Sequence, residues 1–154
     1  MIRFISLTRF FAMAAGVIWC CCPAQTVFAH DKVITAVKVI QASTRSRAID
    51  PALRQIVPEL ESVFKYTEYA LLQDRTLSLA FQEQGRIRLP DQRTLVLTPA
   101  GSQGGRIQYD IQILQKKASV FQTRVLLKNN RSMTIGGPRS EHGVLLFHIT
   151  GSMQ

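Results

Sequence analysis

The sequence is poor in cysteine, tryptophan and acidic residues. Its 154 residues include 3 cysteines and 1 tryptophan, which lie together at positions 19 to 22. The chain after Cys22 therefore has no thiol, and a disulfide framework is excluded there. Only 10 acidic residues stand against 19 lysines and arginines, and the resulting formal charge of +9 favours anionic partners.

Long apolar runs are also missing, apart from one near the N-terminus. The run from Phe10 to Cys22 is shorter than the roughly 20 residues that a helix needs to cross a bilayer. Arg3 and Arg9 precede the run, and a polar segment ending at Ala29 follows it. This is the order of a secretory signal.

We therefore expect residues 1–29 to be a cleaved signal peptide, with an uncleaved anchor as the alternative. A lipid anchor is not expected, because Trp19 before Cys20 is not the small residue that a lipoprotein signal requires. Residues 30–154 would form one domain, periplasmic or extracellular, with one core and no transmembrane helix. Two of the 19 basic residues leave with the signal while all 10 acidic residues remain, so the formal charge becomes +7.

One helix is predicted near the start of this domain. Asp50 can accept hydrogen bonds from free backbone N–H groups, and Pro51 suits the first helical position. The apolar residues that follow at helical spacing are Leu53, Ile56, Val57, Leu60, Val63 and Phe64. They form one stripe, and we expect a sheet to bury Leu60 and Phe64. Pro58 removes a backbone hydrogen bond, so either the helix kinks there or a second helical segment begins.

Alternation of apolar and polar residues dominates the rest of the chain and predicts β-strands. The alternating runs lie within residues 33–42, 75–82, 86–97 with a break at 90–91, 107–113, 121–127, 133–135 and 145–149. We expect the runs after Gly104 to form a β-meander. The fold class predicted is α+β, an antiparallel sheet or small β-sandwich of about seven strands with one N-terminal helix packed on it.

Stretches rich in glycine, asparagine and lysine predict the turns between these runs. We expect turns at Ala100–Gly105, at Lys116–Lys117 and at Lys128–Ser132. The strand that contains Met133 is expected to end at Gly136–Pro138. The Gly-Gly pairs in these stretches lack the strand-to-helix setting of a phosphate loop, so we interpret both as turn glycines.

No motif predicts catalysis, a metal or a cofactor. His142 and His148 lack the clustered spacing of metal ligands, and His30 would bind copper only if cleavage fell directly before it. Ser140, Glu141 and His142 combine nucleophile, acid and base types, but a triad needs side chains that converge from separate elements. We therefore expect a polar loop there.

Six basic residues alternate with apolar residues in the predicted hairpins, and they are the candidate binding residues: Arg86, Arg88, Arg93, Arg124, Lys128 and Arg131. If the two hairpins are neighbours, these side chains form one basic surface. That surface is either a solvated face that guards strand edges or a site for an anionic partner. Nucleic acid is not expected, because aromatic residues for base stacking are missing between the basic residues.

Three segments resemble a group of short, exported, uncharacterised bacterial proteins: IDPAL (Ile49–Leu53), FKYTEYALL (Phe64–Leu72) and MTIGGPRSEHGVLLFHI (Met133–Ile149). The resemblance is loose and implies no known activity. RSMTIGGP (Arg131–Pro138) is similar to the strand-turn segment ending in Gly-Gly of secretins, the outer-membrane channel subunits of secretion and pilus systems. The chain is too short to be a secretin, so this similarity implies only an accessory role in the envelope.

These features predict an exported, non-enzymatic binding or assembly module of the bacterial cell envelope. Its expected partners are an envelope protein or an anionic surface, such as lipid head groups or acidic polysaccharide. The alternative is a small-ligand-binding protein or an enzyme with a pocket between helix and sheet. Converging His, Asp or Glu residues in a deep cleft would favour that alternative.

Overall fold

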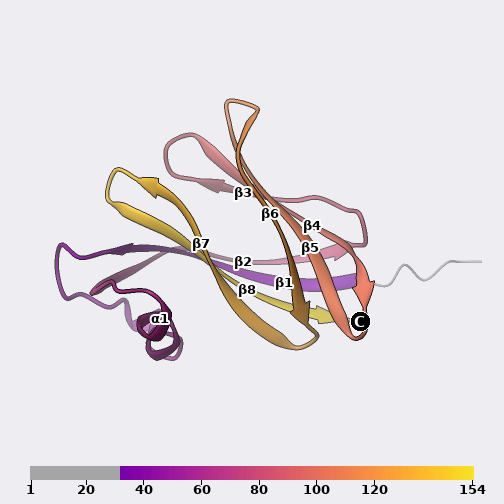
Figure 1. Cartoon of the computed structure of the whole chain (residues 1–154), viewed down its shortest axis with the longest axis horizontal. Coiled ribbons are helices and arrows are strands. Elements are labelled where there is room, and N and C mark those ends of the chain that lie inside the picture. Colours follow the sequence, from indigo (N-terminus) through magenta and orange to yellow (C-terminus); the bar gives the residue numbers. More distant parts are fainter. Residues whose placement is uncertain (1–31) are drawn as a thin grey trace, which may run out of the picture.

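Residues 32–154 are described by the computed structural model, so the predicted signal peptide lies outside the described residues. The strands are β1 (Lys32–Ser43), β2 (Glu68–Ala80), β3 (Gly85–Leu89), β4 (Arg93–Gln103), β5 (Arg106–Gln115), β6 (Ala118–Lys128), β7 (Arg131–Ser140) and β8 (Gly143–Met153). They form two four-stranded antiparallel sheets, sheet A with the order β2-β1-β8-β7 and sheet B with the order β3-β4-β5-β6 (Figure 1). A 3-10 helix, η1 (Pro51–Leu53), and an α-helix, α1 (Val57–Val63), connect β1 to β2.

The main core lies between the two sheets and is built by alternation within the strands. Val33 and Val37 of β1 and Phe147 and Ile149 of β8 are fully buried from the side of sheet A. Sheet B contributes the buried residues Ile87, Leu89, Leu95, Leu97, Ile107, Tyr109, Ile111, Ile113 and Leu127. Each large aliphatic side chain that is fully buried contributes about 1.5–3 kcal/mol. This layer is therefore the main source of stability.

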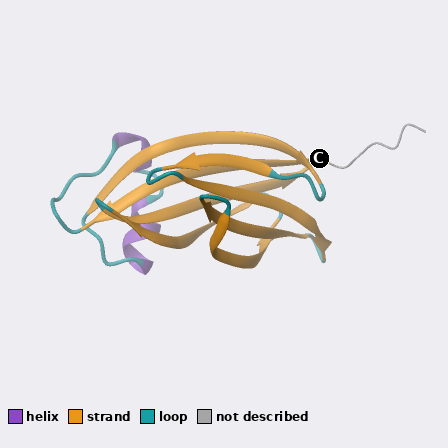
Figure 2. Cartoon of the chain, turned by 90° about the horizontal axis from the view of Figure 1, so that it is seen from above, coloured by secondary structure: helices purple, strands orange, loops and turns teal. Residues whose placement is uncertain are grey.

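A second, smaller core lies on the outer face of sheet A, beneath α1. Leu53 and Leu60 are fully buried and cluster with Ile40 and Leu146 of the sheet. The side chain of Asp50 accepts a hydrogen bond of 2.9 Å from the backbone N–H of Ala52, as the predicted helix start requires. Figure 2 shows the helical segment at one end of the sandwich, away from the C-terminus.

The predicted α+β class is wrong, because the described chain is mostly β and its α-helix has only 7 residues. The helix is also not N-terminal, since β1 precedes it. Pro58 lies in the first turn of α1, where a backbone N–H has no partner within the helix, so the proline costs no hydrogen bond. Of the two alternatives, a second helical segment that begins near Pro58 is therefore correct, and a kinked helix is not. Val63 is 68% exposed, and the predicted stripe therefore extends too far. The next residues lead into β2 at Glu68.

The β-meander predicted after Gly104 is divided between the two sheets. β5 pairs with β6 in sheet B, whereas β7 and β8 belong to sheet A. The chain crosses between the sheets at Asn129 and Asn130, and Asn130 has a φ of 58°, in agreement with the predicted turn. The last strand, β8, then lies inside sheet A between β1 and β7.

Two predicted turns are parts of strands. β7 continues through Gly136, Gly137 and Pro138 to Ser140, with a bulge that restores pairing at Arg139. β4 continues beyond Pro99 in the same way, with an irregular register that resumes at the next glycine. Bulges tolerate proline because the extra residue need not donate to the ladder. Of the predicted Ala100–Gly105 loop, only Gly104 and Gly105 form a turn.

Candidate functional site

The edge strands β2 and β3 border a groove on one side of the sandwich. Its volume is about 460 Å³, and its lining residues are Gln73, Arg75, Leu77, Arg86, Ile87 and Arg88. The two edges approach closely where β3 begins, because a Cβ on Gly85 would lie 2.6 Å from Cδ1 of Leu77. Glycine at this position therefore lets the start of β3 pack directly against β2.

Arginine dominates the charge of this groove. Arg75, Arg86 and Arg88 are all exposed, and within residues 32–154 none of them forms an ion pair. Arg86 Nη2 donates to Gln84 Oε1 at 3.1 Å, which leaves its charge uncompensated. Among the described residues, no carboxylate lines the groove. The groove thus presents a concentrated positive charge.

An apolar floor lies beneath these guanidinium groups. Ile87 is only 3% exposed, and Leu77 is half-buried against the main core. Both side chains come from the inward-facing positions of their strands, as the pairing of Leu77 with Thr35 and of Ile87 with Leu95 shows. The groove can therefore hold a ligand that has negative charge beside apolar groups.

Arg75 belongs to this groove but was not among the predicted binding residues. It pairs with Val37 of β1, and it lies on the same, inward-facing side of β2 as Leu77 and Leu79. The signal in the sequence is an arginine in the apolar phase of a strand. Such a residue is stable only where the facing sheet leaves it uncovered, so it marks an open edge.

The structure places the other predicted basic residues apart from the groove. Arg124 on β6 is on the far edge strand of sheet B, and its Nε and Nη2 donate to the carboxylate of Asp110 at 2.5 and 3.0 Å. This bond raises the pKa of Arg124 and lowers the pKa of Asp110. Lys128 and Arg131 flank the crossing between the sheets. Of the six predicted residues, only Arg86 and Arg88 line the groove.

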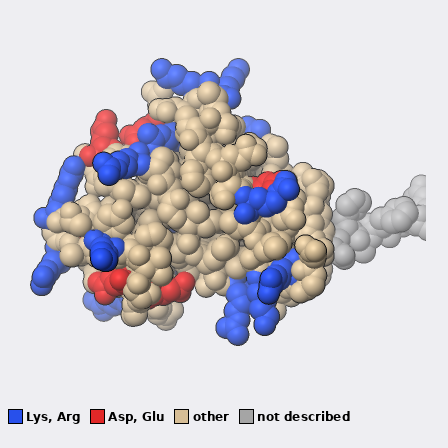
Figure 3. Space-filling view, viewed as in Figure 1, with Lys and Arg blue, Asp and Glu red and all other residues tan. Residues whose placement is uncertain are grey.

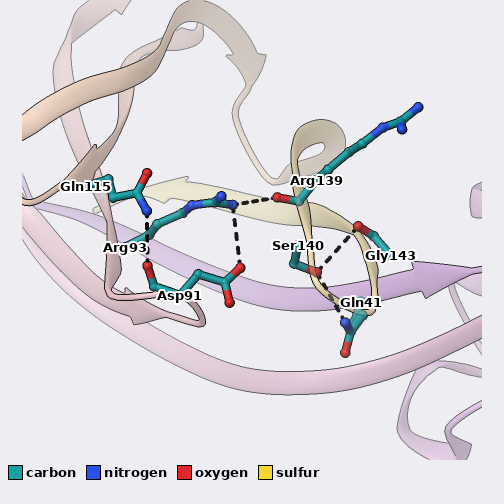
Figure 4. Close-up of polar contacts among 7 residues, drawn as sticks. All are labelled: Gln41, Asp91, Arg93, Gln115, Arg139, Ser140 and Gly143. Carbon is teal, nitrogen blue, oxygen red and sulfur yellow. Dashed lines mark hydrogen bonds and ion pairs between the residues drawn. The ribbon is translucent and has the colours of Figure 1, made fainter.

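Arg93 occupies a different place, at the end of the sandwich where the β7–β8 hairpin approaches sheet B (Figure 4). Its Nη1 donates to the carbonyl oxygen of Arg139 at 2.7 Å and lies 3.8 Å from Oδ2 of Asp91. The side chain is 17% exposed, and its buried Nε has no partner within residues 32–154. In Figure 4 the side chain of Arg139 points away from this contact. Arg93 therefore links the two sheets.

Polar residues gather at the same end of the sandwich around a hollow of about 250 Å³. Its lining residues are Gln41, Ser43, Arg45, Glu68, Ala70 and His142. Ser43 Oγ donates to the carboxylate of Glu68, and this hydrogen bond lowers the pKa of Glu68. Arg45 Nη1 lies 3.3 Å from His142 Nδ1, and Nη2 donates to the Glu141 carbonyl oxygen at 3.0 Å.

The residues of the predicted polar loop do not converge. Ser140 Oγ donates to the carbonyl oxygen of Gly143 at 3.4 Å and accepts from Gln41 Nε2 at 3.2 Å, while His142 contacts Arg45. His148 lies on another surface, the outer face of sheet A, with Nδ1 2.9 Å from Oγ1 of Thr134. In the described part of the chain, no three His, Cys, Asp or Glu residues are placed to hold a metal ion.

Charged groups are unevenly distributed over the visible surface. Figure 3 shows lysine and arginine side chains in separate groups around the periphery, with few acidic groups and a broad uncharged area between them. Positive charge on this face is therefore gathered in local clusters. The groove between β2 and β3 gathers three arginines about one hollow.

Comparison with known proteins gives no relative for this chain: no family model, no curated protein and no solved structure matches it. Within residues 32–154, no helix has both the length and the apolar character needed to cross a membrane.

Proposed function

We propose that this chain is an exported, non-enzymatic binding module of the bacterial cell envelope, and that the groove between β2 and β3 holds an anionic partner. One observation carries the proposal. Arg75, Arg86 and Arg88 line one groove, and no described carboxylate pairs with any of them. Exposed arginines serve solubility equally well when scattered, whereas convergence on a hollow provides several donors for one anion.

The alternative, a ligand pocket between helix and sheet, has less support. The side chains of Leu53, Val57 and Leu60 fill the interface between the helical segment and sheet A. A hollow of about 270 Å³ lies beside this interface and is lined by Arg47, Ile49, Glu61 and Thr67. A mixed-charge lining of this kind gives no strong preference for a charged ligand.

Salt-dependent binding tests the proposal. The probes are vesicles that contain phosphatidylglycerol, polygalacturonate and a glutamate-rich peptide, each measured at low and at moderate salt. We expect at least one anionic probe to bind and to weaken with salt, because exposed charges are screened over about 8 Å at physiological ionic strength. Neutral phosphatidylcholine vesicles serve as the blank.

Two triple variants locate the binding surface. The first changes Arg75, Arg86 and Arg88 to Gln. The second changes Arg124, Lys128 and Arg131 to Gln, which removes the same formal charge from β6 and the start of β7, away from the groove. We expect only the first variant to lose binding. Equal losses would show that net charge alone attracts the probe. If the parent protein binds none of the anionic probes, the proposal is refuted.

We also propose that export removes the segment before His30. The order of basic, apolar and polar residues ending at Ala29 supports this cleavage site. Measurement of the intact mass of the exported protein tests it. A mass that includes Cys20 to Cys22, or that includes acyl chains, would contradict it.

A further inference from the structure

The backbone of β3 faces the groove with hydrogen-bonding groups. The pairing of β3 with β4 matches Arg86 with Val96, Ile87 with Leu95 and Arg88 with Thr94. In an antiparallel ladder, alternate residues direct both N–H and C=O to the same neighbour. Gln73 Nε2 of β2 donates to the Arg88 carbonyl oxygen at 2.5 Å, so Arg88 directs its backbone groups away from β4.

Arg86 shares this orientation, because it lies two residues from Arg88 in the same strand. The β4 register agrees, since the carbonyl oxygen of Pro99 accepts from Gln82 N at 2.7 Å on the β3 side. Leu95 and Leu97 lie at alternate positions from Pro99 along β4, so their backbone N–H and C=O groups also point toward β3. The N–H and C=O groups of Arg86 and Arg88 thus point into the space beside the edge of sheet B.

The neighbouring edge, β2, is covered at both ends. At its start, Tyr69 exchanges hydrogen bonds of 2.9 Å with Ala48 and Asp50, and Leu71 N donates to Oδ2 of Asp50 at 3.3 Å. At its end, Ala80 N donates to Oε2 of Glu83 at 2.8 Å. The groove lies beside the stretch between these covers. β2 is therefore covered on both sides of the groove, while along the groove the carbonyl oxygen of Arg88 on β3 is capped by the side chain of Gln73.

A strand added to the edge of β3 would have a defined chemistry. Successive residues on one face of a strand are about 6.7 Å apart, so acidic residues at alternate positions would lie beside Arg86 and Arg88 on the outer face. The intervening residues would face inward, above Leu77 and Ile87. Apolar or small side chains fit those positions. The complementary sequence therefore alternates acidic and apolar residues.

We infer that the occupant of the groove is an extended, acidic segment of a partner protein, which adds a strand to the β3 edge of sheet B. This inference rests on the anionic partner proposed above and names its class. Backbone N–H and C=O groups at the regular spacing of a strand serve another extended backbone, whereas a lipid head group or a polysaccharide cannot complete the ladder. A second copy of β3 is disfavoured, because two arginine-bearing edges repel each other.

Backbone methylation of a peptide tests the pairing directly. The parent probe is a seven-residue peptide that alternates Glu and Val, and its binding to the exported protein is measured by calorimetry. One derivative is N-methylated at the odd residues and a second at the even residues. Only one of these sets can face β3, because alternate N–H groups of a strand point in opposite directions. We expect one derivative to lose about tenfold or more in affinity and the other to lose little.

Variants at the groove supply the side-chain test. Arg86→Gln with Arg88→Gln should weaken binding of the parent peptide about tenfold or more, whereas Arg124→Gln with Lys128→Gln should leave it nearly unchanged. Gln73→Ala frees the carbonyl oxygen of Arg88 for the incoming strand, so this variant should bind as well as the parent or more tightly. Circular dichroism spectra that match the parent show that each variant is folded.

Each outcome has a distinct meaning. If both methylated derivatives bind like the parent peptide, strand addition is wrong, while an anionic partner still stands. If the peptide fails to bind but an anionic vesicle or polygalacturonate binds through Arg75, Arg86 and Arg88, the class of partner is wrong and the groove remains the site. If no probe binds, the proposed function and this inference both fall.

Discussion

Thr35 on β1 and Tyr109 on β5 share a hydrogen bond of 2.8 Å between their hydroxyl groups, in the layer between the two sheets. Both side chains are fully buried, and burial raises the pKa of Tyr109. The bond connects sheet A to sheet B through an apolar layer, where each hydroxyl has the other as its partner. A hydrogen bond has a preferred direction, which apolar contacts lack, so this pair favours one alignment of the two sheets.

Replacing one member of this pair should destabilise the protein by leaving the other hydroxyl without a partner. We expect Tyr109→Phe or Thr35→Val to lower the free energy of unfolding by about 1–3 kcal/mol. The double variant should lose less than the sum of the two single losses, because no unsatisfied hydroxyl remains. Urea denaturation of all four proteins measures the coupling, and strictly additive losses would show that the bond contributes nothing.

The helix should contribute to stability through Leu60, which is fully buried beneath it. We expect Leu60→Ala to cost about 2–5 kcal/mol, as is usual for a large-to-small change in a core. Val63 lies in the same helix but is 68% exposed, so Val63→Ala serves as the control and should change stability by less than about 0.5 kcal/mol. Equal denaturant midpoints for the two variants would contradict the docking of α1 on sheet A.

Stability should decrease in mildly acidic solution because of His148. Its side chain is 6% exposed, and burial lowers its pKa; Glu59 opposes this shift and Lys38 adds to it. Below the unfolded-chain pKa of about 6.5, the unfolded chain binds a proton that the folded protein does not. The free energy of unfolding should therefore decrease as the pH is lowered, by at most about 1.4 kcal/mol per pH unit. The decrease should end when the pH reaches the lower pKa of His148 in the folded protein.

Denaturation at a series of pH values between 7.5 and 5 would measure this dependence, with His148→Gln as the control that cannot titrate. We expect the variant to show a smaller slope in this range. Glutamine keeps a group that can bond to Thr134, the present neighbour of Nδ1. A slope that is unchanged in the variant would assign the pH dependence to other groups.

Two adjacent glycines in β7 should respond differently to alanine. A Cβ on Gly137 would lie 2.4 Å from Cε2 of Phe147 and 3.0 Å from the carbonyl oxygen of Leu145, whereas a Cβ on Gly136 would meet Cε1 of Phe64 at 3.6 Å. We expect Gly137→Ala to cost about 1–3 kcal/mol through overpacking and Gly136→Ala to cost little. Thermal unfolding of both variants checks this. A loss confined to Gly136→Ala would mean that the bulge lies elsewhere.

The sequence predicted individual strands better than it predicted how they assemble. Alternation identified the buried faces of the residues around Ile107 and Ile111, because burial of one face imposes a period of two. It could not place β8, since the same alternation suits either sheet. The predicted apolar stripe of the helix was too long for a related reason. Val63 continues the helical spacing of apolar residues, but the helix ends there and extended residues lead into β2.

The candidate groove was predicted only in part. Arg86 and Arg88 could be found because they alternate with buried residues of a single strand. Arg75 could be recognised only as an arginine among the apolar positions of its strand, because its place beside Arg86 and Arg88 depends on β2 and β3 lying on the same side of the sandwich, which is a property of topology. Arg124 was predicted as a binding residue but lies outside the groove and is paired with Asp110. That pairing could not be predicted, because Asp110 lies 14 residues away on a neighbouring strand whose register the sequence leaves open.

The interior position of β8 determines when this protein can fold. β1 pairs with β2 on one side, but its other side pairs with the last strand, from Val33 opposite Met153 to Ala42 opposite Val144. Ordering such a distant pair early is slow, because a long loop must close before any contact forms. Sheet A therefore completes its pairing only after β8 has been synthesised, and a fragment that ends before Gly143 should lose the pairing of β1 and β7 with β8, with a weaker β-sheet signal in circular dichroism than the parent.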